Sequence, residues 1–216
     1  MRLRPTSVLG IGTEQGSRSK LVPDTQLVIS SDSVRMLDMI VKNVTQVGNK
    51  VIRATSLEVP TPTSKSTQKV VTDLVDSMRH HNLVGMAAPQ IGKGVRVFVT
   101  EIRQTKLRKR DTASLDPLRI FINPKILSTS KKEAKDWEGC GSVAMANLFG
   151  MVKRPVSIEV EAFNEQGMKF RLKAKNLLAR VIQHEMDHLN GKLFVDAADS
   201  RTYMSRNEYL KMRAKA

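Results

Sequence analysis

The chain carries the stretch Gln183-His184-Glu185-Met186-Asp187-His188, in which two histidines stand four residues apart and a glutamate follows the first. Residues at this spacing lie one turn apart on the same face of an α-helix, so both imidazoles can bind one metal ion. The glutamate can then act on a water molecule beside that ion. Two histidines on a helix surface, without a ligand, are the plainer explanation of the same residues. We predict a metal-binding helix that needs a third ligand from elsewhere in the chain.

The residues around this stretch predict that the helix is buried. We expect it to begin at Leu177 after a capping Asn176 and to end at Asn190, with Gly191 suited to the left-handed position beyond the end. Buried histidine and glutamate side chains need partners, which a metal ion provides. Arg180 is unexpected in a helix this apolar. The apolar residues form two adjoining stripes, Leu177 and Val181 in line with the histidines and Leu178, Ile182 and Leu189 beside them.

Helix and strand patterns alternate along the rest of the chain. Val70–Met78 follows helical spacing, with Ser64, Ser66 or Thr67 as candidate caps. These patterns predict an α+β fold in which antiparallel β-sheets pack around the central metal-binding helix that carries H-E-x-x-H. The strand patterns are Val95–Thr100, Arg119–Ile122 closed by Asn123-Pro124, and the two arms of an antiparallel hairpin, Val156–Ala162 and Phe170–Ala174.

The composition is that of a basic chain with a single cysteine. The length of 216 residues suits one domain with an extension at one end. The 36 Lys and Arg against 21 Asp and Glu, a formal net charge of +15, suggest an anionic partner such as RNA, a ribosome surface or acidic lipid. A solvated surface without such a partner explains the charge equally well. The single cysteine excludes an intrachain disulfide and fits a reducing compartment. No apolar run is long enough to span a bilayer, which predicts a soluble protein.

That cysteine, Cys140, is the candidate third ligand. It lies in the run Asp136-Trp137-Glu138-Gly139-Cys140-Gly141-Ser142-Val143, where a glycine stands on each side of it. Such glycines leave a thiolate approachable and allow the N–H of Gly141 to point at a ligand. A free cysteine is more often a small core residue. Beside H-E-x-x-H, however, Cys140 completes a Cys-His-His site with one open position.

A second segment of small residues, Gly85-Met86-Ala87-Ala88-Pro89-Gln90, precedes the cysteine in the chain. Small side chains let the backbone approach a ligand or another backbone closely, and Gln90 offers an amide donor just after Pro89. A tight structural turn explains the segment as well as a binding role does.

Together, the segments Gly85–Gln90, Glu138–Ser142 and Gln183–His188 resemble peptide deformylase. The family's signatures are G-x-A-A-x-Q, E-G-C-x-S and H-E-x-D-H, and all three occur here in that order. The resemblance extends over roughly residues 46 to 202. It implies hydrolysis of the N-formyl group from the N-terminal methionine of newly made polypeptides, with release of formate.

The chain departs from typical bacterial deformylases at positions that are not metal ligands. Leu83 stands where a glycine is usual, and Gly141 where a leucine is usual. Typical bacterial deformylases have a proline soon after the serine of E-G-C-x-S, and this chain has Ala144-Met145 there. The non-leucine residue after Cys140 and the run Asp199-Ser200-Arg201-Thr202 are more similar to the mitochondrial branch. The details of the substrate groove are therefore expected to differ.

The resemblance also implies roles for individual residues. Glu185 would take a proton from the attacking water and return it to the departing amine. The Gln90 amide and the Gly141 N–H would stabilise the formyl oxygen. The native ion would be Fe2+, with Zn2+, Ni2+ or Co2+ able to take its place. The metal ligands would be Cys140, His184 and His188.

The substrate, an N-formyl-Met nascent peptide, would lie extended against the backbone of the groove. We expect Asp187 to orient a ligand or cap the site rather than bind the metal, because it lies off the histidine stripe. Glu138 is placed to pair with Arg154. The substrate-binding residues would be Val84, Gly85 and Gly139 along the peptide, and Val181 in the methionine pocket.

Two other classes of protein share parts of the pattern. A zinc peptidase uses the same H-E-x-x-H helix, but its third ligand is normally a downstream His or Glu. A non-catalytic protein with a structural zinc and a basic RNA-binding surface would need four protein ligands, and the sequence offers three.

The ends of the chain lie outside the resemblance. We expect an N-terminal extension over residues 1–45, a catalytic domain over 46–204 and a basic tail over 205–216. The basic, Ser- and Thr-containing start is typical of an organellar targeting segment, although a disordered tail of a cytoplasmic protein would look similar. Because formylated initiation belongs to bacteria and organelles, we expect a mitochondrion or another organelle. The sequence indicates neither an oligomeric state nor whether the ribosome is a direct partner.

Overall fold

A computed structural model describes residues 40–105 and 115–215 of the chain. They belong to one compact unit. Residues just before the expected start of the catalytic domain at residue 46 contact the rest of this unit. The N–H groups of Thr45 and Val47 donate to the carbonyls of Gln90 and Ser142, both at 2.8 Å. Most of the expected targeting segment, residues 1–39, lies outside the described residues.

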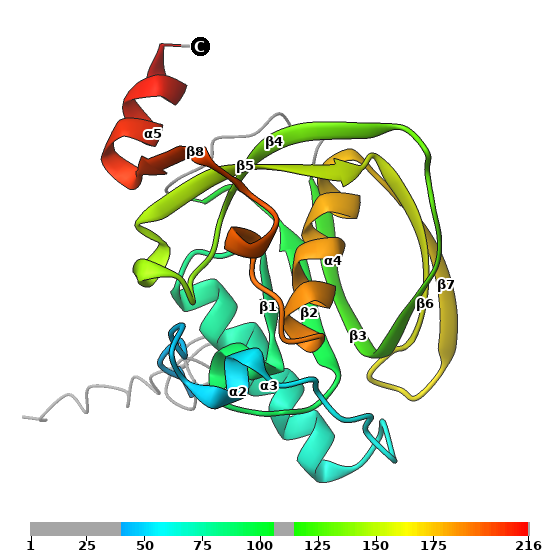
Figure 1. Cartoon of the computed structure of the whole chain (residues 1–216). Coiled ribbons are helices and arrows are strands. Elements are labelled where there is room, and N and C mark those ends of the chain that lie inside the picture. Colours follow the sequence, from blue (N-terminus) through cyan, green and yellow to red (C-terminus); the bar gives the residue numbers. More distant parts are fainter. Residues whose placement is uncertain (1–39, 106–114, 216) are drawn as a thin grey trace, which may run out of the picture. The chain divides into compact units, whose positions relative to one another are not determined.

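Two antiparallel β-sheets form the framework (Figure 1). The five-stranded sheet has the order β1-β2-β3-β6-β7, and the three-stranded sheet has the order β4-β5-β8. The fold is therefore α+β with antiparallel sheets, as predicted. The strands are β1 Gly85–Ala87, β2 Val97–Ile102, β3 Asp116–Thr129, β4 Glu133–Gly139, β5 Leu148–Pro155, β6 Ser157–Phe163, β7 Lys169–Lys175 and β8 Asp199–Ser205.

The predicted hairpin is confirmed, because β6 and β7 pair from Ser157 with Lys175 to Phe163 with Lys169. The predicted end of a strand at Asn123-Pro124 is wrong, since β3 continues to Thr129. Asn123 has a left-handed φ of 50° at an irregularity in the pairing with β6. Its side-chain amide bonds to both the N–H and the carbonyl of Val59, each at 2.8 Å. The dipeptide therefore bends the strand without ending it.

Two helices cover opposite faces of the five-stranded sheet. Helix α3, Lys65–His80, begins at Ser64, whose side chain caps it by accepting from the Thr67 N–H. Side chains alternate between the two faces of a strand. Met86 of β1 packs in the cluster with α3, whereas the next residue, Ala87, packs in the cluster with α4. Residues of β2 and β3 divide between the two clusters in the same way.

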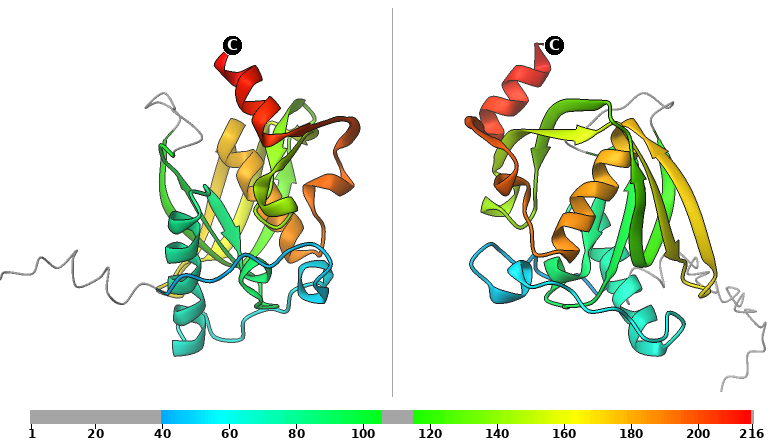
Figure 2. Two further views of the ribbon diagram at one scale, coloured as in Figure 1. Left: turned by 90° about the vertical axis from the view of Figure 1, so that its left-hand side faces the viewer. Right: turned by 45° about the vertical axis from the view of Figure 1, so that its right-hand side comes forward.

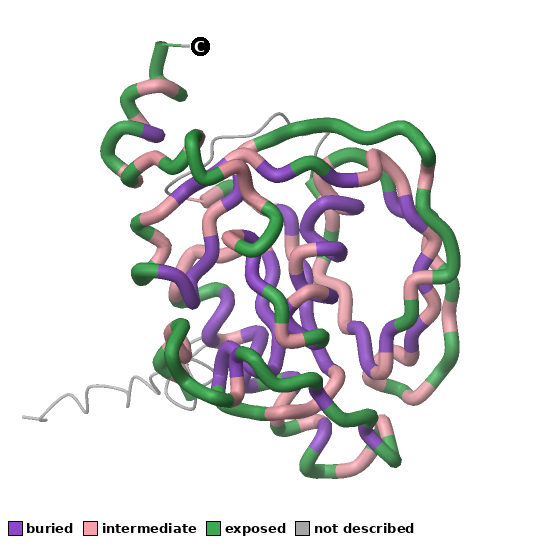
Figure 3. The backbone as a smooth tube through the Cα atoms, viewed as in Figure 1, coloured by how far each residue is buried: buried purple, intermediate pink, exposed green. Residues whose placement is uncertain are grey.

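Helix α4, Asn176–Leu189, lies between the two sheets and contacts strands of both (Figure 1). It starts one residue before the prediction, at Asn176, so the N-cap is Lys175, whose side chain makes no capping bond. Gly191 follows its end with a φ of 69°, as predicted, and a side chain there would collide with the carbonyl of Arg53. Figure 3 shows α4, β1 and β2 as mostly buried, whereas β4 and β7 are largely exposed.

Short elements complete the described unit. The expected basic tail forms a helix, α5, which follows β8 and projects from the three-stranded sheet (Figure 2). Its Tyr209 is buried and stacks on Phe149 of β5, with ring centres 4.2 Å apart. None of the described helices is both long and apolar enough to cross a membrane. The short elements are the helices α2 Lys50–Arg53 and α5 Arg206–Ala214 and the 3-10 helices η1 Ala88–Ile91, η3 Ala144–Ala146 and η4 Phe194–Asp196.

Candidate metal centre

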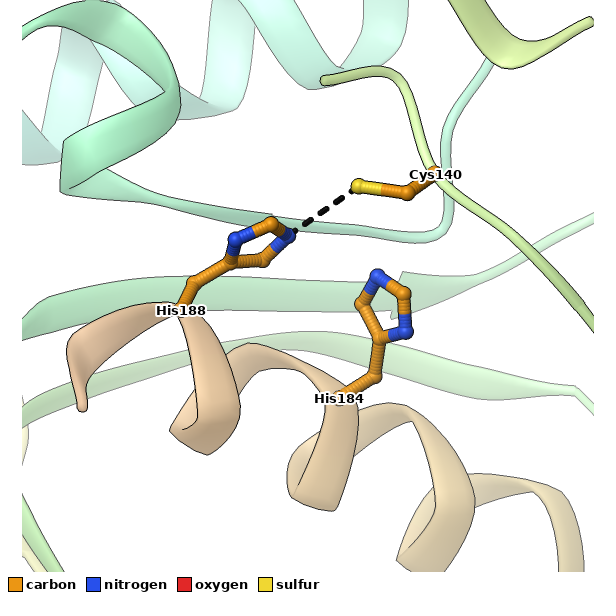
Figure 4. Close-up of side chains that lie close together, drawn as sticks. All are labelled: Cys140, His184 and His188. Atoms are coloured by element: carbon orange, nitrogen blue, oxygen red, sulfur yellow. Dashed lines mark hydrogen bonds between the residues drawn. The ribbon is translucent and has the colours of Figure 1, made fainter. Parts of the chain in front are cut away.

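Three candidate metal ligands meet between α4 and the end of β4. His184 and His188 lie one turn apart on α4 and both point toward Cys140, which follows β4 (Figure 4). The Cys140 Sγ atom lies 3.2 Å from His188 Nε2. One ligand atom from each of the three residues lies within 4.8 Å of the others. Metal–ligand bonds of about 2.0–2.3 Å fit this spacing.

The surroundings favour the form of Cys140 that binds metals. Burial raises the pKa of its thiol, but the charge of His188 and hydrogen bonds from His184 and His188 lower that pKa well below the ordinary value. The Ser142 N–H also points at Sγ, at 3.4 Å. The thiolate is the metal-binding form of cysteine. The site therefore presents a thiolate and two imidazoles, a donor set that suits several divalent ions.

Two polar atoms beside these ligands lack hydrogen-bond partners among the described residues, Glu185 Oε2 and His188 Nδ1. Buried polar atoms normally have a hydrogen-bond partner, so the unpartnered Glu185 Oε2 atom indicates that a ligand or a water molecule binds here. A metal-binding histidine usually donates its other ring N–H to an acceptor. His184 does so and His188 does not. With this one departure, the residues fit a bound divalent ion.

Glu138, the last residue but one of β4, orients His184. Its Oε2 atom lies 3.0 Å from His184 Nδ1, which leaves Nε2 of the ring for a metal. Arg154 holds the same carboxylate with two bonds, Nε to Oε1 at 2.6 Å and Nη2 to Oε2 at 2.9 Å. Burial raises the pKa of Glu138, but the bonds from His184 and Arg154 hold it well below its usual range. The predicted Glu138–Arg154 pair is thus confirmed.

Asp187 joins this network from α4. Its Oδ2 atom accepts a bond from Arg154 Nη1 at 2.8 Å. Asp187 therefore acts on the centre indirectly, through Arg154 and Glu138, and its side chain lies away from the candidate ligands.

Glu185 is buried beside the ligands, and burial raises the pKa of its carboxyl to about 7, against the lowering effect of His184 and His188. Gly85 of β1 approaches it so closely that a Cβ atom there would lie 2.5 Å from Glu185 Oε1 and 2.9 Å from Val181 Cγ1. Any side chain at position 85 would therefore displace Glu185. A carboxyl group with a pKa near neutral is suited to both accept and donate a proton.

Gln90 of η1 is buried and faces the cysteine. Its Oε1 atom accepts the N–H of Ala87 at 2.9 Å, which fixes the orientation of the amide. Its Nε2 atom then faces Cys140 Sγ at 3.7 Å and Ser142 Oγ at 3.4 Å. The Gly141 N–H makes no bond to another described group, while the Gly141 carbonyl accepts from Gln46 Nε2 at 2.8 Å. The Gln90 amide thus points at the thiolate, and the N–H of Gly141, the residue next to Cys140, has no partner among the described groups.

A cavity of about 720 Å³ opens onto the centre. It runs between β1, an edge strand of one sheet, and β4, an edge strand of the other. Edge strands carry unpaired backbone groups, so an extended peptide can bond to them. The sequence-predicted residues in its wall are Val84, Gly85, Gln90, Gly139, Cys140, Gly141, Val181, His184 and Glu185.

All predicted site residues therefore come together. His188 alone among them does not line the cavity, but it is buried and its Nε2 atom lies 3.2 Å from Cys140 Sγ. Sequence reasoning missed the aromatic and basic residues that α5 adds to the wall, Tyr209 and Arg213. It also gave Arg180 no role, although a charged residue on an apolar helix was a signal that a buried partner exists.

Comparisons with known proteins agree with this geometry. The family model for polypeptide deformylase matches residues 41–203. A peptide deformylase of Clostridium botulinum is 37% identical over 161 residues, which cover 73% of this chain and 97% of that protein. A peptide deformylase of Natranaerobius thermophilus is 37% identical over 132 residues, 61% of this chain and 76% of the relative.

Solved structures with a similar fold include bacterial deformylases with bound ligands. The Met-Ala-Ser-bound class I type b enzyme of Acinetobacter baumannii has a TM-score of 0.67 at 28% identity and covers 73% of this chain and 99% of its own. The actinonin-bound enzyme of Ehrlichia chaffeensis has a TM-score of 0.66 at 30% identity, over 82% and 97% of the two chains. The chain therefore belongs to the polypeptide deformylase family, the metal-dependent hydrolases that remove the N-formyl group from newly made polypeptides.

Proposed function

We propose that this chain carries out deformylation with Cys140, His184 and His188 as the ligands of one divalent ion. The observation that carries the assignment is the convergence of one thiolate and two imidazoles next to the unpartnered carboxyl oxygen of Glu185. When bound, the ion supplies a Lewis acid that lowers the pKa of water and polarises the formyl carbonyl.

Glu185 is the proton carrier in this proposal. It accepts the proton of the attacking water and delivers it to the amine nitrogen as the C–N bond of the formamide breaks. The pKa of about 7 supports both directions of transfer near neutral pH. The backbone of Gly85 restricts the carboxyl group on one side, since a Cβ atom at position 85 would lie 2.5 Å from Glu185 Oε1.

Gln90 and the Gly141 N–H stabilise the charge that develops on the formyl oxygen. Donors fixed in advance are effective because they need no rearrangement during the reaction. The bond from the Ala87 N–H to Gln90 Oε1 supplies that fixation, because it turns the amide nitrogen toward Cys140.

The substrate peptide lies extended between the two sheet edges. Val84 and Gly85 hold it from the β1 side, and Gly139 holds it from the β4 side. A Cβ atom at Gly139 would lie 2.6 Å from the Phe149 ring, so β4 can pack this closely against β5 only because residue 139 is a glycine. Val181, which faces the cavity from α4, contacts the methionine side chain. The crystal structure of the Acinetobacter enzyme with Met-Ala-Ser supports a peptide ligand of this kind.

The decisive experiment replaces Glu185 with Gln and measures formate release from formyl-Met-Ala-Ser. We expect turnover to fall by about 10²–10⁴-fold, the usual contribution of a general acid–base group, while the bound metal per chain stays the same. Formate release at the wild-type rate would contradict the mechanism. Cleavage of unformylated peptides by the wild-type protein would favour a zinc peptidase instead.

For the ion we propose Fe2+, with Zn2+, Ni2+ or Co2+ able to occupy the same ligands. Metal content of protein purified without oxygen, set beside its activity, tests this assignment. A preparation that contains zinc alone and has full activity would contradict it.

We further propose that the chain works in a mitochondrion or another organelle and belongs to the organellar branch of the family. The basic start of the sequence supports this proposal, although the relatives and structures named above are bacterial. Mass spectrometry of the mature N-terminus in cells tests it, since an intact residue 1 would exclude a cleaved targeting segment.

The net charge of +15 also supports a ribosome surface as partner. Co-sedimentation with purified ribosomes at two salt concentrations tests this contact. Binding that does not weaken at high salt would exclude the electrostatic explanation.

A further inference from the structure

Arg180 is a buried cation on the helix that carries the histidines. It lies one turn before His184 on α4, and only 8% of its surface is exposed. Its Nη1 atom donates to Glu138 Oε1 at 2.7 Å. The same guanidinium donates to two backbone carbonyls of the three-stranded sheet, Val152 at 3.0 Å and Ala134 at 2.7 Å. Arg180 therefore connects α4 to both β4 and β5.

With Arg180 in place, every acceptor position of the Glu138 carboxylate is used. Oε1 accepts from Arg154 Nε and Arg180 Nη1, and Oε2 accepts from Arg154 Nη2 and His184 Nδ1. A carboxylate offers about four lone-pair directions. The Glu138 carboxylate cannot rotate without breaking a bond to an arginine. Its Oε2 atom is therefore held in the position from which it bonds to His184.

The two halves of the candidate metal centre come from different elements. His184 and His188 lie on α4, whereas Cys140 follows β4, which ends well before α4 along the chain. The distance between thiolate and imidazoles therefore depends on how α4 is held against the three-stranded sheet. Arg180 bonds α4 directly to β4 through Glu138, which stands two residues before Cys140.

The charges of this network also balance. Arg154 and Arg180 carry two positive charges, and Glu138 and Asp187 carry two negative charges. Without Arg180, one negative charge would lie uncompensated in a buried region next to His184, which is costly. Of the two arginines, only Arg154 would then hold the Glu138 carboxylate.

We infer that Arg180 is a positioning residue that holds the Glu138 carboxylate and α4 so that His184 and Cys140 face a common metal ion. This inference rests on the proposed Cys140–His184–His188 site. It assigns Arg180 no contact with the reacting atoms. Residues that support metal ligands from behind typically change metal affinity by about 10–100-fold when they are replaced.

The test compares the Co2+ affinities of metal-free variants by competition with a chelator. Arg180→Met keeps the length of the side chain and removes all its donors, and we expect Co2+ to bind about 10–100-fold more weakly. The absorption band of a thiolate–Co2+ bond reports separately whether Cys140 still binds the ion. We expect this band to weaken in Arg180→Met at Co2+ concentrations that saturate the wild type.

Gln183→Leu is the matched control. Gln183 is a buried residue of α4 and donates to the Pro155 carbonyl of β5 at 3.1 Å, but it is not among the residues that bond to Glu138. Its loss should lower the melting temperature while Co2+ affinity stays within about twofold of the wild type, since ligand support accounts for the larger changes. Equal loss of affinity in Gln183→Leu and Arg180→Met would overturn the inference, because general loosening of α4 would then explain both.

Arg180→Lys covers the case in which Arg180→Met does not fold. Lysine keeps the charge but cannot bond to Glu138, Ala134 and Val152 in the planar arrangement of a guanidinium. We expect intermediate Co2+ affinity, and wild-type affinity in every folded Arg180 variant would overturn the inference. A wild-type protein that binds no Co2+ at one ion per chain would contradict the proposed metal site itself, and the role of Arg180 with it.

Discussion

Two glutamates, Glu138 and Glu101, each sit between two arginines, but the consequences differ. Glu138 bonds to Arg154 and Arg180, and its side chain is 5% exposed. Glu101 of β2 bonds to Arg79 at 2.9 and 2.7 Å and lies 3.3 Å from a nitrogen of Arg103. Its own side chain is 15% exposed, and that of Arg79 is 41% exposed. The same three ionic groups thus occur once in the interior and once at the surface.

The difference lies in what completes each group. Water can solvate the extra positive charge around Glu101, so no further partner is required. Around Glu138 the second arginine is balanced by Asp187, and the fourth hydrogen bond goes to His184. Buried charges must be paired with good geometry, whereas exposed pairs contribute little. Burial therefore makes the Glu138 cluster part of the candidate metal centre, and the Glu101 cluster a surface tie between α3 and β2.

The largest effect should follow Glu138→Gln. The amide keeps the shape but presents an NH2 group to arginine and histidine donors, and it leaves two buried arginines against one aspartate. Breaking a buried ionic pair typically costs about 3–5 kcal/mol. We expect the free energy of unfolding of the metal-free protein, measured by urea denaturation, to fall by about that amount, together with a loss of Co2+ affinity. A change below about 1 kcal/mol would show that the cluster behaves like a surface pair.

Asp187→Asn should have a smaller effect. The Asp187 side chain is 26% exposed and, within the described part of the chain, bonds only to Arg154, and an asparagine oxygen can still accept that bond. We expect the free energy of unfolding to fall by about 1 kcal/mol, below the range for hydrogen bonds to fully buried charged groups. Co2+ affinity should fall less than in Arg180→Met. A loss of affinity as large as that of Glu138→Gln would mean that Asp187 acts on the ion directly.

The contrast between the two clusters also shows where sequence reasoning worked. Helix α4, the β6–β7 hairpin and the grouping of Cys140 with the histidines were predictable, because periodicity and motif spacing are local signals. The ligands converge as the motifs indicated, and their binding of a metal stays a prediction. The Glu138–Arg154 pair followed from spacing alone.

The three-stranded sheet was not predictable in the same way. The first four residues of β4 are all exposed, so that strand has no alternation of apolar and polar residues to reveal it. Without β4, the sequence could not show that Ala134 and Glu138 face Arg180 across a sheet boundary. Likewise, β3 continues past Asn123, where the Asn123 side chain bonds to the distant backbone of Val59. Such contacts depend on tertiary structure.

Glu101→Gln should change stability least at neutral pH. Exposed pairs contribute about 0.2–1 kcal/mol, so we expect the free energy of unfolding to fall by about 0.5 kcal/mol. Screening by salt weakens exposed pairs more than buried ones. The difference between Glu101→Gln and the wild type should therefore shrink in high salt, whereas the difference for Glu138→Gln should persist. Equal salt sensitivity of the two variants would remove the distinction drawn from burial.

Acid should erase the small contribution of Glu101 first. Hydrogen bonds from Arg79 lower the pKa of Glu101 below its ordinary value of 4.5, against the opposing effect of burial. A carboxyl group whose pKa is lower in the folded state binds fewer protons there than in the unfolded chain. Its contribution is complete above the unfolded value and is lost as the pH falls through the folded value. Denaturation of the wild type and Glu101→Gln should give a constant difference from pH 8 to about pH 5, and converging stabilities below about pH 4.5. A difference that instead grows toward acid would mean that Arg79 does not hold Glu101 in its charged form.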